Sequence, residues 1–557
     1  MAARRRGPGH RSGRLRPDAV RRCLGGRARQ RLPAPARPVG RIPVSGWEPQ
    51  LVGAAVTYPP HILDLLEPWF DADGPAVSDR EATLTYRELA DRSAALAREL
   101  RAHGVRPGDC VVVHALMSRW AVVGMLGALR AGARYVAVDA AFPVARQQLM
   151  AAASGARVAV TEPGLPLALD GLSVVEMEQL THRPADSLTE PAAAGAAPAS
   201  GRGEAAYTCF TSGSTGVPKG VTVSASALAY STAARLAYYR EPVRVFLLCS
   251  SISFDSSVAG IYWTLAGGGH LVIPASRPAD LVAVGRAARR WRPSHLLMVP
   301  SLYRVALRGG LAADLGSLST SIVAGEACPP ALVGEHLAAL PRTRLYNEYG
   351  PTECTVWCTV HACGPADVTG ISVSLGTPIP GARLYVRDSA GAPARPGEVG
   401  ELYVGGPGVA RPATPDPDPD SSPFRPVDDE WLYRTGDLVA VGNDGLLTFH
   451  GRLDDQLKLG AVRVERGEIE HVLTAAAGVA AAAVGVVTKG ARHRVVGFVV
   501  PTGTVPDVPR IRAFMLTRLP AAALPVRFEA VSSLPVLPNG KVDHGELDRR
   551  AASLVAV

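Results

Sequence analysis

Near the middle of the chain stands Thr211-Ser212-Gly213-Ser214-Thr215-Gly216-Val217-Pro218-Lys219-Gly220, a run of hydroxyl residues and glycines with one lysine near its end. Glycine lets the backbone approach an anion closely and present its N–H groups. The hydroxyls add rotatable donors, and Lys219 adds a point charge. The run therefore predicts a phosphate-binding loop rather than a linker, although it is not the Gly-x-x-x-x-Gly-Lys-Ser/Thr pattern.

Apolar segments around this loop predict a layered α/β fold. Residues 205–210 form a short apolar run that is typical of a strand leading into the loop. Upstream, the pattern predicts a buried strand at 110–113, a helix at 121–129 and a strand at 135–139, with short connections. This order favours parallel pairing, so we expect an α/β body with mixed sheets and helices.

The charge of the chain is concentrated at its start. Residues 1–50 hold 13 Lys/Arg and 2 Asp/Glu, a net of +11, so the other 507 residues carry −2 against +9 for the whole chain. We interpret residues 1–56 as a disordered basic extension, or a start placed too far upstream, in preference to a transit peptide or a nucleic-acid-binding arm. No basic footprint for nucleic acid extends through the body.

The remaining composition indicates a globular protein. Hydrophobic residues make up 47% of the chain and charged residues 20%. No apolar run reaches the roughly 18 residues of a membrane span, so we expect a cytoplasmic protein without a membrane partner.

Eight cysteines are scattered along the chain, and Cys354, Cys358 and Cys363 stand close in sequence. Three neighbouring cysteines could indicate a metal site. Their spacing, however, matches no common zinc-binding pattern, and no other Cys or His pair completes a set of four ligands. We interpret the cysteines as reduced, mostly buried thiols.

Three further segments carry polar residues in specific patterns: Asn347-Glu348-Tyr349-Gly350-Pro351-Thr352-Glu353, Tyr433-Arg434-Thr435-Gly436-Asp437-Leu438 and Pro538-Asn539-Gly540-Lys541-Val542-Asp543. With the loop, and in this order, they resemble the motifs of the adenylate-forming (AMP-binding) superfamily. That superfamily includes acyl-CoA synthetases, luciferases and the adenylation domains of nonribosomal peptide synthetases. The 16 residues after Lys541 hold no carrier attachment site, so the resemblance implies either a free-standing adenylation domain or a fragment of a longer protein.

The resemblance implies ATP and Mg²⁺ as cofactors. By this resemblance Tyr349 lies near the base, Thr352 contacts the α-phosphate, and Asp437 accepts the ribose hydroxyls. Glu353 helps to hold Mg²⁺, which requires oxygen ligands. The residues expected to bind the nucleotide are Thr211, Ser212, Gly213, Ser214, Thr215, Gly216, Lys219, Asn347, Tyr349, Thr352, Asp437 and Arg452. The expected catalytic residues are Lys541, Lys219 and Glu353.

Asp255 is the residue that points to an amino acid as substrate. In amino-acid-activating members of the superfamily, the matching Asp holds the α-ammonium group, and a buried carboxylate suits that role. The side-chain pocket implied by the resemblance consists of Asp255, Ser256, Ala259, Met298, Ile322, Ala324, Glu348, Val356 and Trp357, with Lys541 at its mouth. Glu348 is the only charged residue expected beside the substrate side chain. Because a buried carboxylate needs a donor, a phenolic amino acid such as tyrosine is the favoured substrate, and a basic amino acid is the runner-up.

The resemblance also divides the chain. It implies a large N-terminal subdomain over residues 57–453 and a small, mobile α+β subdomain over 454–557 that carries Lys541, with a hinge at Asp454. Downstream of the hinge, Gly460-Ala461 departs from the family pattern. In the family, this loop helps to admit the phosphopantetheine arm of the carrier protein. The departure therefore concerns the second half-reaction, in which the acyl group passes to that arm.

The predicted function is ATP-dependent activation of an amino acid as aminoacyl-AMP and transfer to the phosphopantetheine thiol of a separate peptidyl carrier protein. A small MbtH-like helper protein is a further partner to consider. The alternatives are an acyl- or aryl-acid CoA ligase, which Asp255 disfavours, and an inactive AMP-binding module, which the intact motifs disfavour.

Overall fold

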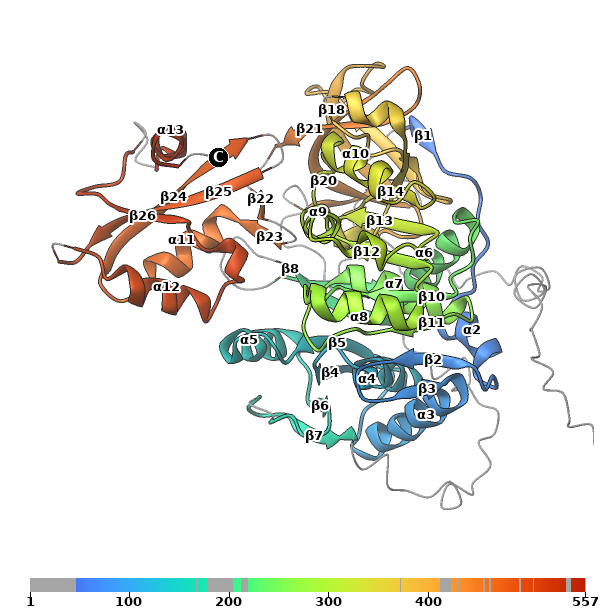
Figure 1. The fold of residues 1–557 in the computed structure, drawn as a ribbon. Coiled ribbons are helices and arrows are strands. Elements are labelled where there is room, and N and C mark those ends of the chain that lie inside the picture. Colours follow the sequence, from blue (N-terminus) through green and yellow to red (C-terminus); the bar gives the residue numbers. More distant parts are fainter. Residues whose placement is uncertain are drawn as a thin grey trace, which may run out of the picture.

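The computed structural model describes residues 47–166, 169–177, 204–211, 219–370, 372–410, 422–427, 430–453, 456–459, 462–489, 492–503, 505–536 and 542–555. Within these ranges the chain forms a large body of three sheets and a smaller C-terminal unit, which lies beside the body in Figure 1. The α/β fold class predicted from the sequence is confirmed.

The largest sheet has nine strands in the order β16-β15-β14-β13-β12-β10-β11-β2-β3. Its strands are β2 (Pro75–Ser78), β3 (Thr83–Thr85), β10 (Val245–Leu248), β11 (His270–Val272), β12 (His295–Met298), β13 (Thr320–Ala324), β14 (Arg344–Tyr349), β15 (Thr359–Cys363) and β16 (Thr377–Pro378). Pairing is parallel from β14 through β2 and antiparallel at both ends. The helices that connect its strands are α7 (Asp255–Ala266), α8 (Leu281–Trp291), α9 (Pro300–Arg308) and α10 (Pro330–Ala339).

A second sheet has six strands in the order β7-β6-β4-β5-β8-β9. They are β4 (Cys110–Ala115), β5 (Arg134–Asp139), β6 (Val158–Thr161), β7 (Ser173–Glu176), β8 (Ala205–Thr211) and β9 (Lys219–Ser224). Helices α3 (Tyr86–Ala102), α4 (Arg119–Ala131), α5 (Val144–Ser154) and α6 (Ala225–Tyr238) accompany it, and the short α2 (Leu63–Leu66) precedes both sheets. The predicted strands at 110–113 and 135–139 and the helix at 121–129 are all present.

One apolar core joins the two sheets. A single cluster contains residues of β4 and β5, of β10 and β13, and of the helices α3, α4, α6 and α7. Nearly every residue of α7 is buried, which is typical of a helix enclosed between layers. The opposite face of the nine-stranded sheet packs against α8, α9 and α10 in a separate cluster. The region between the sheets therefore holds α6 and α7 rigidly, and it is here that the site described below is built.

The third sheet shows that the folded body begins upstream of the predicted boundary. Its strands are β1 (Leu51–Val52), β17 (Arg383–Arg387), β18 (Val399–Gly405), β19 (Phe424–Val427), β20 (Glu430–Val441) and β21 (Leu447–Arg452). β1 pairs antiparallel with β17. Trp47 packs against Tyr385 and Tyr403, and Gln50 exchanges hydrogen bonds with Val386. The prediction that residues 1–56 form an extension is therefore wrong for residues 47–56.

The C-terminal unit has its own small sheets and core. Its strands are β22 (Gln456–Leu459), β23 (Val462–Glu465), β24 (Val479–Lys489), β25 (Arg492–Pro501) and β26 (Arg527–Ala530), and its helices are α11 (Arg466–Thr474), α12 (Val508–Leu516) and α13 (His544–Leu554). Apolar side chains of β22, β24, β25, α11 and α12 form a common core. The body's last strand ends at Arg452 and the unit's first begins at Gln456.

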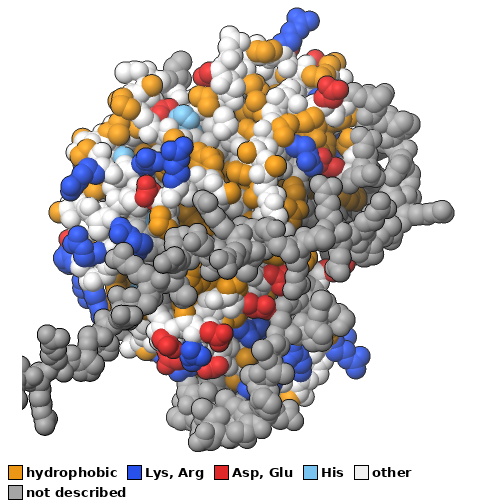
Figure 2. All heavy atoms as spheres, turned by 90° about the vertical axis from the view of Figure 1, so that its right-hand side faces the viewer, with side chains coloured by type: hydrophobic (Ala, Val, Ile, Leu, Met, Phe, Trp, Pro, Cys, Tyr) orange, Lys and Arg blue, Asp and Glu red, His pale blue; other side chains and the backbone are white. Residues whose placement is uncertain are grey.

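Charges of both signs are interspersed on the face of the molecule in Figure 2, among hydrophobic and neutral side chains. Among the described helices, none is both long and apolar enough to cross a lipid bilayer.

Two truncations test the corrected start of the fold. Residues 1–46 lie outside the described residues and include no predicted site residue, so we expect their removal to leave the unfolding midpoint in urea unchanged. Removing residues 1–52 also deletes Trp47, Gln50 and β1, and should lower the free energy of unfolding by on the order of 1–3 kcal/mol. Equal destabilisation by both truncations would contradict this boundary.

Candidate active site

The β8–β9 hairpin presents the phosphate-loop candidate. β8 and β9 pair antiparallel, and Thr211 stands opposite Lys219 where the two strands meet the loop. The Thr211 hydroxyl donates a hydrogen bond to the Lys219 carbonyl at 3.3 Å, and Lys219 is exposed. The loop residues Ser212, Gly213, Ser214, Thr215 and Gly216 lie outside the described residues. The hairpin nonetheless fixes where both ends of the loop emerge.

Three of the predicted nucleotide ligands meet at one point. The Tyr349 hydroxyl at the end of β14 donates to the Asp437 carboxylate on β20, and the Arg452 guanidinium on β21 forms an ion pair with the same carboxylate. Arg452 also donates to the Thr435 carbonyl at 2.9 Å. Burial raises the pKa of Tyr349, and the Asp437 charge adds to the shift, so the phenol stays protonated as a donor. The cluster can orient a polyhydroxylated group such as ribose.

The segment after β14 places two further candidates. Glu353 lies in the 3-10 turn Thr352–Cys354 and is buried, and its carbonyl accepts from the Ala410 backbone. A carboxylate is a hard oxygen donor, so its chemistry fits Mg²⁺. Thr352 is half-buried beside it. Asn347 donates through its side chain to the Ser374 carbonyl at 2.8 Å, which fixes its position on β14.

Asp255 begins α7, and a polar network fixes the approach to that helix. The Ser253 hydroxyl donates to the Ala137 carbonyl and accepts from the Asp139 backbone N–H, both at 2.9 Å. Burial raises the pKa of the Cys209 thiol on β8, and the negative charges of Asp255 and Glu353 contribute to the shift. Asp255 lines a small cavity together with Thr208 and Cys209 of β8, so the amine-binding candidate lies beside the strand that leads into the phosphate loop.

Glu348 has protein partners that the sequence did not reveal. Arg235 on α6 donates to both of its carboxylate oxygens at 2.6 and 2.8 Å, and the Tyr239 hydroxyl donates to one of them. Both charged side chains are 1% exposed. The inference that Glu348 needs a donor from the substrate is therefore wrong, since Arg235 and Tyr239 already satisfy it.

Aromatic rings surround this ion pair. The Arg235 guanidinium lies 4.1 Å from the centre of the Trp357 ring and 5.7 Å from that of Trp263, and Tyr239 stacks on Trp357 with the ring planes 19° apart. Arg235 Nε and Trp357 Nε1 are buried and make no hydrogen bond within the described residues. A neutralised ion pair thus lies among aromatic rings inside the core, with two N–H groups that have no acceptor among the residues the structure describes.

The remaining pocket candidates fall on two faces of the nine-stranded sheet. Leu297 stands opposite Ile322 and Ala324 stands opposite Glu348 in the strand register, and alternation puts these side chains on one face. Met298 points the other way and packs in the cluster on the far face with Val323 and Tyr303. The prediction that Met298 lines the pocket is therefore not supported, and Leu297 holds the corresponding place. Ser256 and Ala259 follow Asp255 on α7.

A strained turn positions Trp357. Thr355 and Val356 have φ of 55° and 80°, which is rare for β-branched residues. Two hydrogen bonds hold the turn: the Ser231 hydroxyl on α6 donates to the Thr355 carbonyl at 2.9 Å, and the Thr355 hydroxyl donates to the Gly408 carbonyl at 2.6 Å. Strain of this kind persists only where the surroundings enforce it. Helix α6 therefore supports both Glu348 and the turn that presents Trp357.

Lys541 and Asp454 lie outside the described residues, so the roles assigned to them stay predictions. The three neighbouring cysteines of the sequence do not come together. Cys354 and Cys358 pack in one apolar cluster, whereas Cys363 packs with Cys328 in another.

Comparisons with known proteins agree with this arrangement. The model of the AMP-binding enzyme family matches residues 70–412. Novobiocin biosynthesis protein H of Streptomyces niveus is 35% identical over 490 residues, covering 85% of this chain and 79% of that protein. Phosphinothricin tripeptide synthetase PhsC of Streptomyces viridochromogenes is also 35% identical, but the chain spans only 44% of its length. The solved structure of PA1221, an NRPS protein containing adenylation and PCP domains, matches with a TM-score of 0.74 at 25% identity over 88% of this chain and 84% of that one.

The buried ion pair makes a specific stability prediction. Glu348→Gln leaves the Arg235 charge without its counter-ion and should cost about 3–5 kcal/mol in the free energy of unfolding. Joint replacement of Arg235 and Glu348 by methionine should recover most of that loss, because the buried charge is removed with its partner. Urea denaturation measures both effects. Asp314→Asn, which breaks the exposed pair with Arg289, is the control and should cost under about 1 kcal/mol. A loss of under about 1 kcal/mol for Glu348→Gln would contradict the pairing.

Proposed function

Since the chain belongs to the AMP-binding enzyme family, we propose that it activates an amino acid as aminoacyl-AMP and passes it to the phosphopantetheine thiol of a separate carrier protein. The observation that carries the proposal is the contact of Tyr349 and Arg452 with Asp437, and the position of Asp255 beside strand β8 of the phosphate-loop hairpin supports it. Aminoacyl adenylation requires a site for the nucleotide and a site for the amine of the substrate.

In the proposed reaction, an oxygen of the substrate carboxylate attacks the α-phosphorus of ATP, and the bond to the leaving pyrophosphate breaks. The carboxylate is already ionised at neutral pH, so no general base is required. Both reactants are anionic, so the residues act by positioning and by offsetting charge. Lys219 would hold the pyrophosphate and Lys541 would lie between the carboxylate and the α-phosphate. Mg²⁺, held by Glu353, would neutralise phosphate charge.

The polarity of the pocket supports an uncharged substrate side chain that accepts hydrogen bonds. Glu348 is neutralised by Arg235, so a second cation there would meet a guanidinium without a free counter-ion. Arg235 Nε and Trp357 Nε1 are donors that have no acceptor in the part of the chain that the structure describes. A phenol oxygen can accept from such donors, whereas a lysine ammonium cannot. A phenolic amino acid such as tyrosine therefore stays the favoured substrate. Its phenol oxygen would accept a hydrogen bond from the protein and would not donate one to Glu348, and a basic amino acid is disfavoured.

The proposed partner is a peptidyl carrier protein. PA1221 contains adenylation and PCP domains in one protein, which supports a carrier as acceptor here as well. A helper protein of the MbtH-like kind stays a proposal. The alternative of an acyl- or aryl-acid CoA ligase would leave Asp255 without an ammonium to bind.

Asp255 separates amino-acid activation from acid activation. Asp255→Asn removes the charge but keeps the shape, so kcat/KM for tyrosine in ATP–pyrophosphate exchange should fall about 10- to 100-fold, the value of one charge-assisted hydrogen bond. The deaminated acid, 3-(4-hydroxyphenyl)propanoate, should be a poor substrate of both proteins. Exchange with this acid that equals exchange with tyrosine in the unmutated enzyme would favour the ligase alternative.

Lys541 tests the two-step scheme. Lys541→Ala should lower pyrophosphate exchange by at least about 100-fold, as expected when a charge-stabilising group is lost. Transfer from pre-made aminoacyl-AMP to a carrier thiol should stay largely intact, because the residue acts in adenylation only. Equal loss of both steps would show that the residue is structural.

A further inference from the structure

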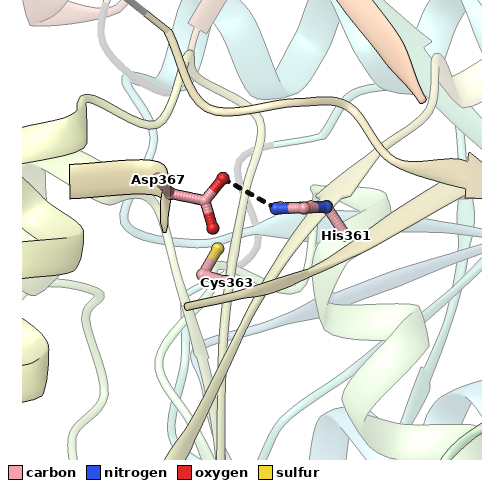
Figure 3. Close-up of side chains that lie close together, drawn as sticks. All are labelled: His361, Cys363 and Asp367. Atoms are coloured by element: carbon pink, nitrogen blue, oxygen red, sulfur yellow. Dashed lines mark hydrogen bonds and ion pairs between the residues drawn. The ribbon is translucent and has the colours of Figure 1, made fainter. Parts of the chain in front are cut away.

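A group of metal-binding side chains lies outside the site described above. His361 and Cys363 alternate along β15 and therefore project from the same side of the strand. Asp367 belongs to the short 3-10 helix Pro365–Thr369 that follows. One ligand atom from each residue lies within 4.8 Å of the others, and Figure 3 shows the imidazole, the thiol and the carboxylate turned toward one another.

Cys328 adds a fourth donor from a different part of the chain. It lies between β13 and α10. Its side chain packs in the same apolar cluster as Cys363. Two sulfurs, one imidazole nitrogen and one carboxylate oxygen are thus gathered from two segments.

This donor set suits one class of cation. Zn²⁺ takes four ligands in a tetrahedron and binds Cys, His and Asp side chains. Thiolate and imidazole also disfavour Mg²⁺ and Ca²⁺, which prefer oxygen. At Zn–S and Zn–N lengths of about 2.3 and 2.0 Å, tetrahedral ligand atoms lie roughly 3.3–3.8 Å apart, so shifts on the order of 1 Å would bring the ligand atoms of His361, Cys363 and Asp367 to these separations. The Cys328 side chain would turn toward them to complete the tetrahedron. We propose that Cys328, His361, Cys363 and Asp367 form a structural site for one Zn²⁺.

The surroundings favour such a site. His361 Nε2 and Asp367 Oδ1 are 2.9 Å apart, and the other Asp367 oxygen accepts from the Gly364 backbone N–H at 2.7 Å. That second bond orients the carboxylate as an outer-sphere contact does in metal proteins. His361, Cys363 and Asp367 are partly exposed, so an ion can enter. On binding, the His361–Asp367 contact is replaced by two bonds to the metal and both thiols release a proton to solvent.

The site would brace the strand that carries the nucleotide motif. β15 pairs antiparallel with β14, and His361 stands opposite Asn347. Cross-linking β15 to the segment before α10 would therefore hold β15 against β14, the strand that carries Asn347 and Tyr349. The expected consequence is higher stability and not a new catalytic step.

Metal titration of the full chain tests the proposal without reference to its activity. Protein stripped with a chelator and kept reduced should bind about one Zn²⁺ per chain, and Co²⁺ should give the visible bands of tetrahedral cobalt and a near-ultraviolet thiolate charge-transfer band. Zn²⁺ should also raise the melting temperature, by mass action on the folded state.

Variants assign the ligands. Cys328→Ser, Cys363→Ser and His361→Gln should each lower the Zn²⁺ affinity by at least about 10- to 100-fold and abolish the thermal shift. Cys110→Ala, a buried thiol in a separate cluster, should leave both unchanged. His361→Gln is the variant to rely on if a cysteine variant does not fold. Less than half an equivalent of Zn²⁺ in the unmutated protein, or affinity unchanged by all three variants, would overturn the proposal.

Discussion

The ion pair between Arg235 and Glu348 is the interaction on which the rest of the site depends. It connects residues 113 positions apart in sequence and ties α6 to β14 inside the core. Two buried charges cost several kcal/mol each in lost hydration, and a bidentate pair offsets this only when its geometry is good and its remaining groups are satisfied. Tyr239 supplies one of those additional bonds and the Trp357 ring covers the guanidinium. The main effect of the ion pair is therefore to fix the position of α6 relative to β14, and it contributes little net free energy to folding.

Fixing α6 has consequences on both sides of β14. Through Ser231 the helix holds the strained turn that presents Trp357. Gly350 packs so closely on that turn that a Cβ would lie 2.4 Å from the Trp357 Cα, which explains why glycine follows Tyr349. Alternation along β14 then places Asn347 on the face opposite Glu348. Glu348 and the substrate pocket thus lie on one face of the sheet at β14. Asn347 lies on the other face, which is also the face on which His361 and Cys363 of β15 lie.

Local pattern was sufficient for much of the fold. Helix α3 begins at Thr85, whose side chain accepts from the Glu88 N–H while Glu88 accepts from the Thr85 N–H, a capping box that fixes the start of the helix. Helix α4 ends at Gly132, which has φ of 86°. The motif order also predicted that Tyr349, Asp437 and Arg452 belong to one site, and the structure brings them together.

Contacts between distant segments could not be predicted in the same way. Arg235 sits in an Ala-rich helix, and the only signal was a charged residue within an apolar run, which is rarely buried unless paired. Met298 and Leu297 differ by one position, and a one-residue error in strand register reverses the side-chain direction. The contact between Cys328 and Cys363 depends on how α10 packs on the sheet, which no local spacing encodes. Trp47 and β1 follow a proline- and arginine-rich stretch. Because that composition is typical of a disordered segment, the short strand β1 was not predicted.

The most direct test of the pocket is ATP–pyrophosphate exchange by the unmutated enzyme with tyrosine, phenylalanine, lysine and ornithine. Glu348 is neutralised, and two donors near it have no acceptor among the described residues. This predicts that tyrosine exceeds phenylalanine by at least about tenfold, because a site built to hydrogen-bond a hydroxyl discriminates against the analogue that lacks it. Lysine and ornithine should be near background. Preferential exchange with lysine or ornithine would contradict the account, since it would mean that Glu348 serves the substrate and not Arg235.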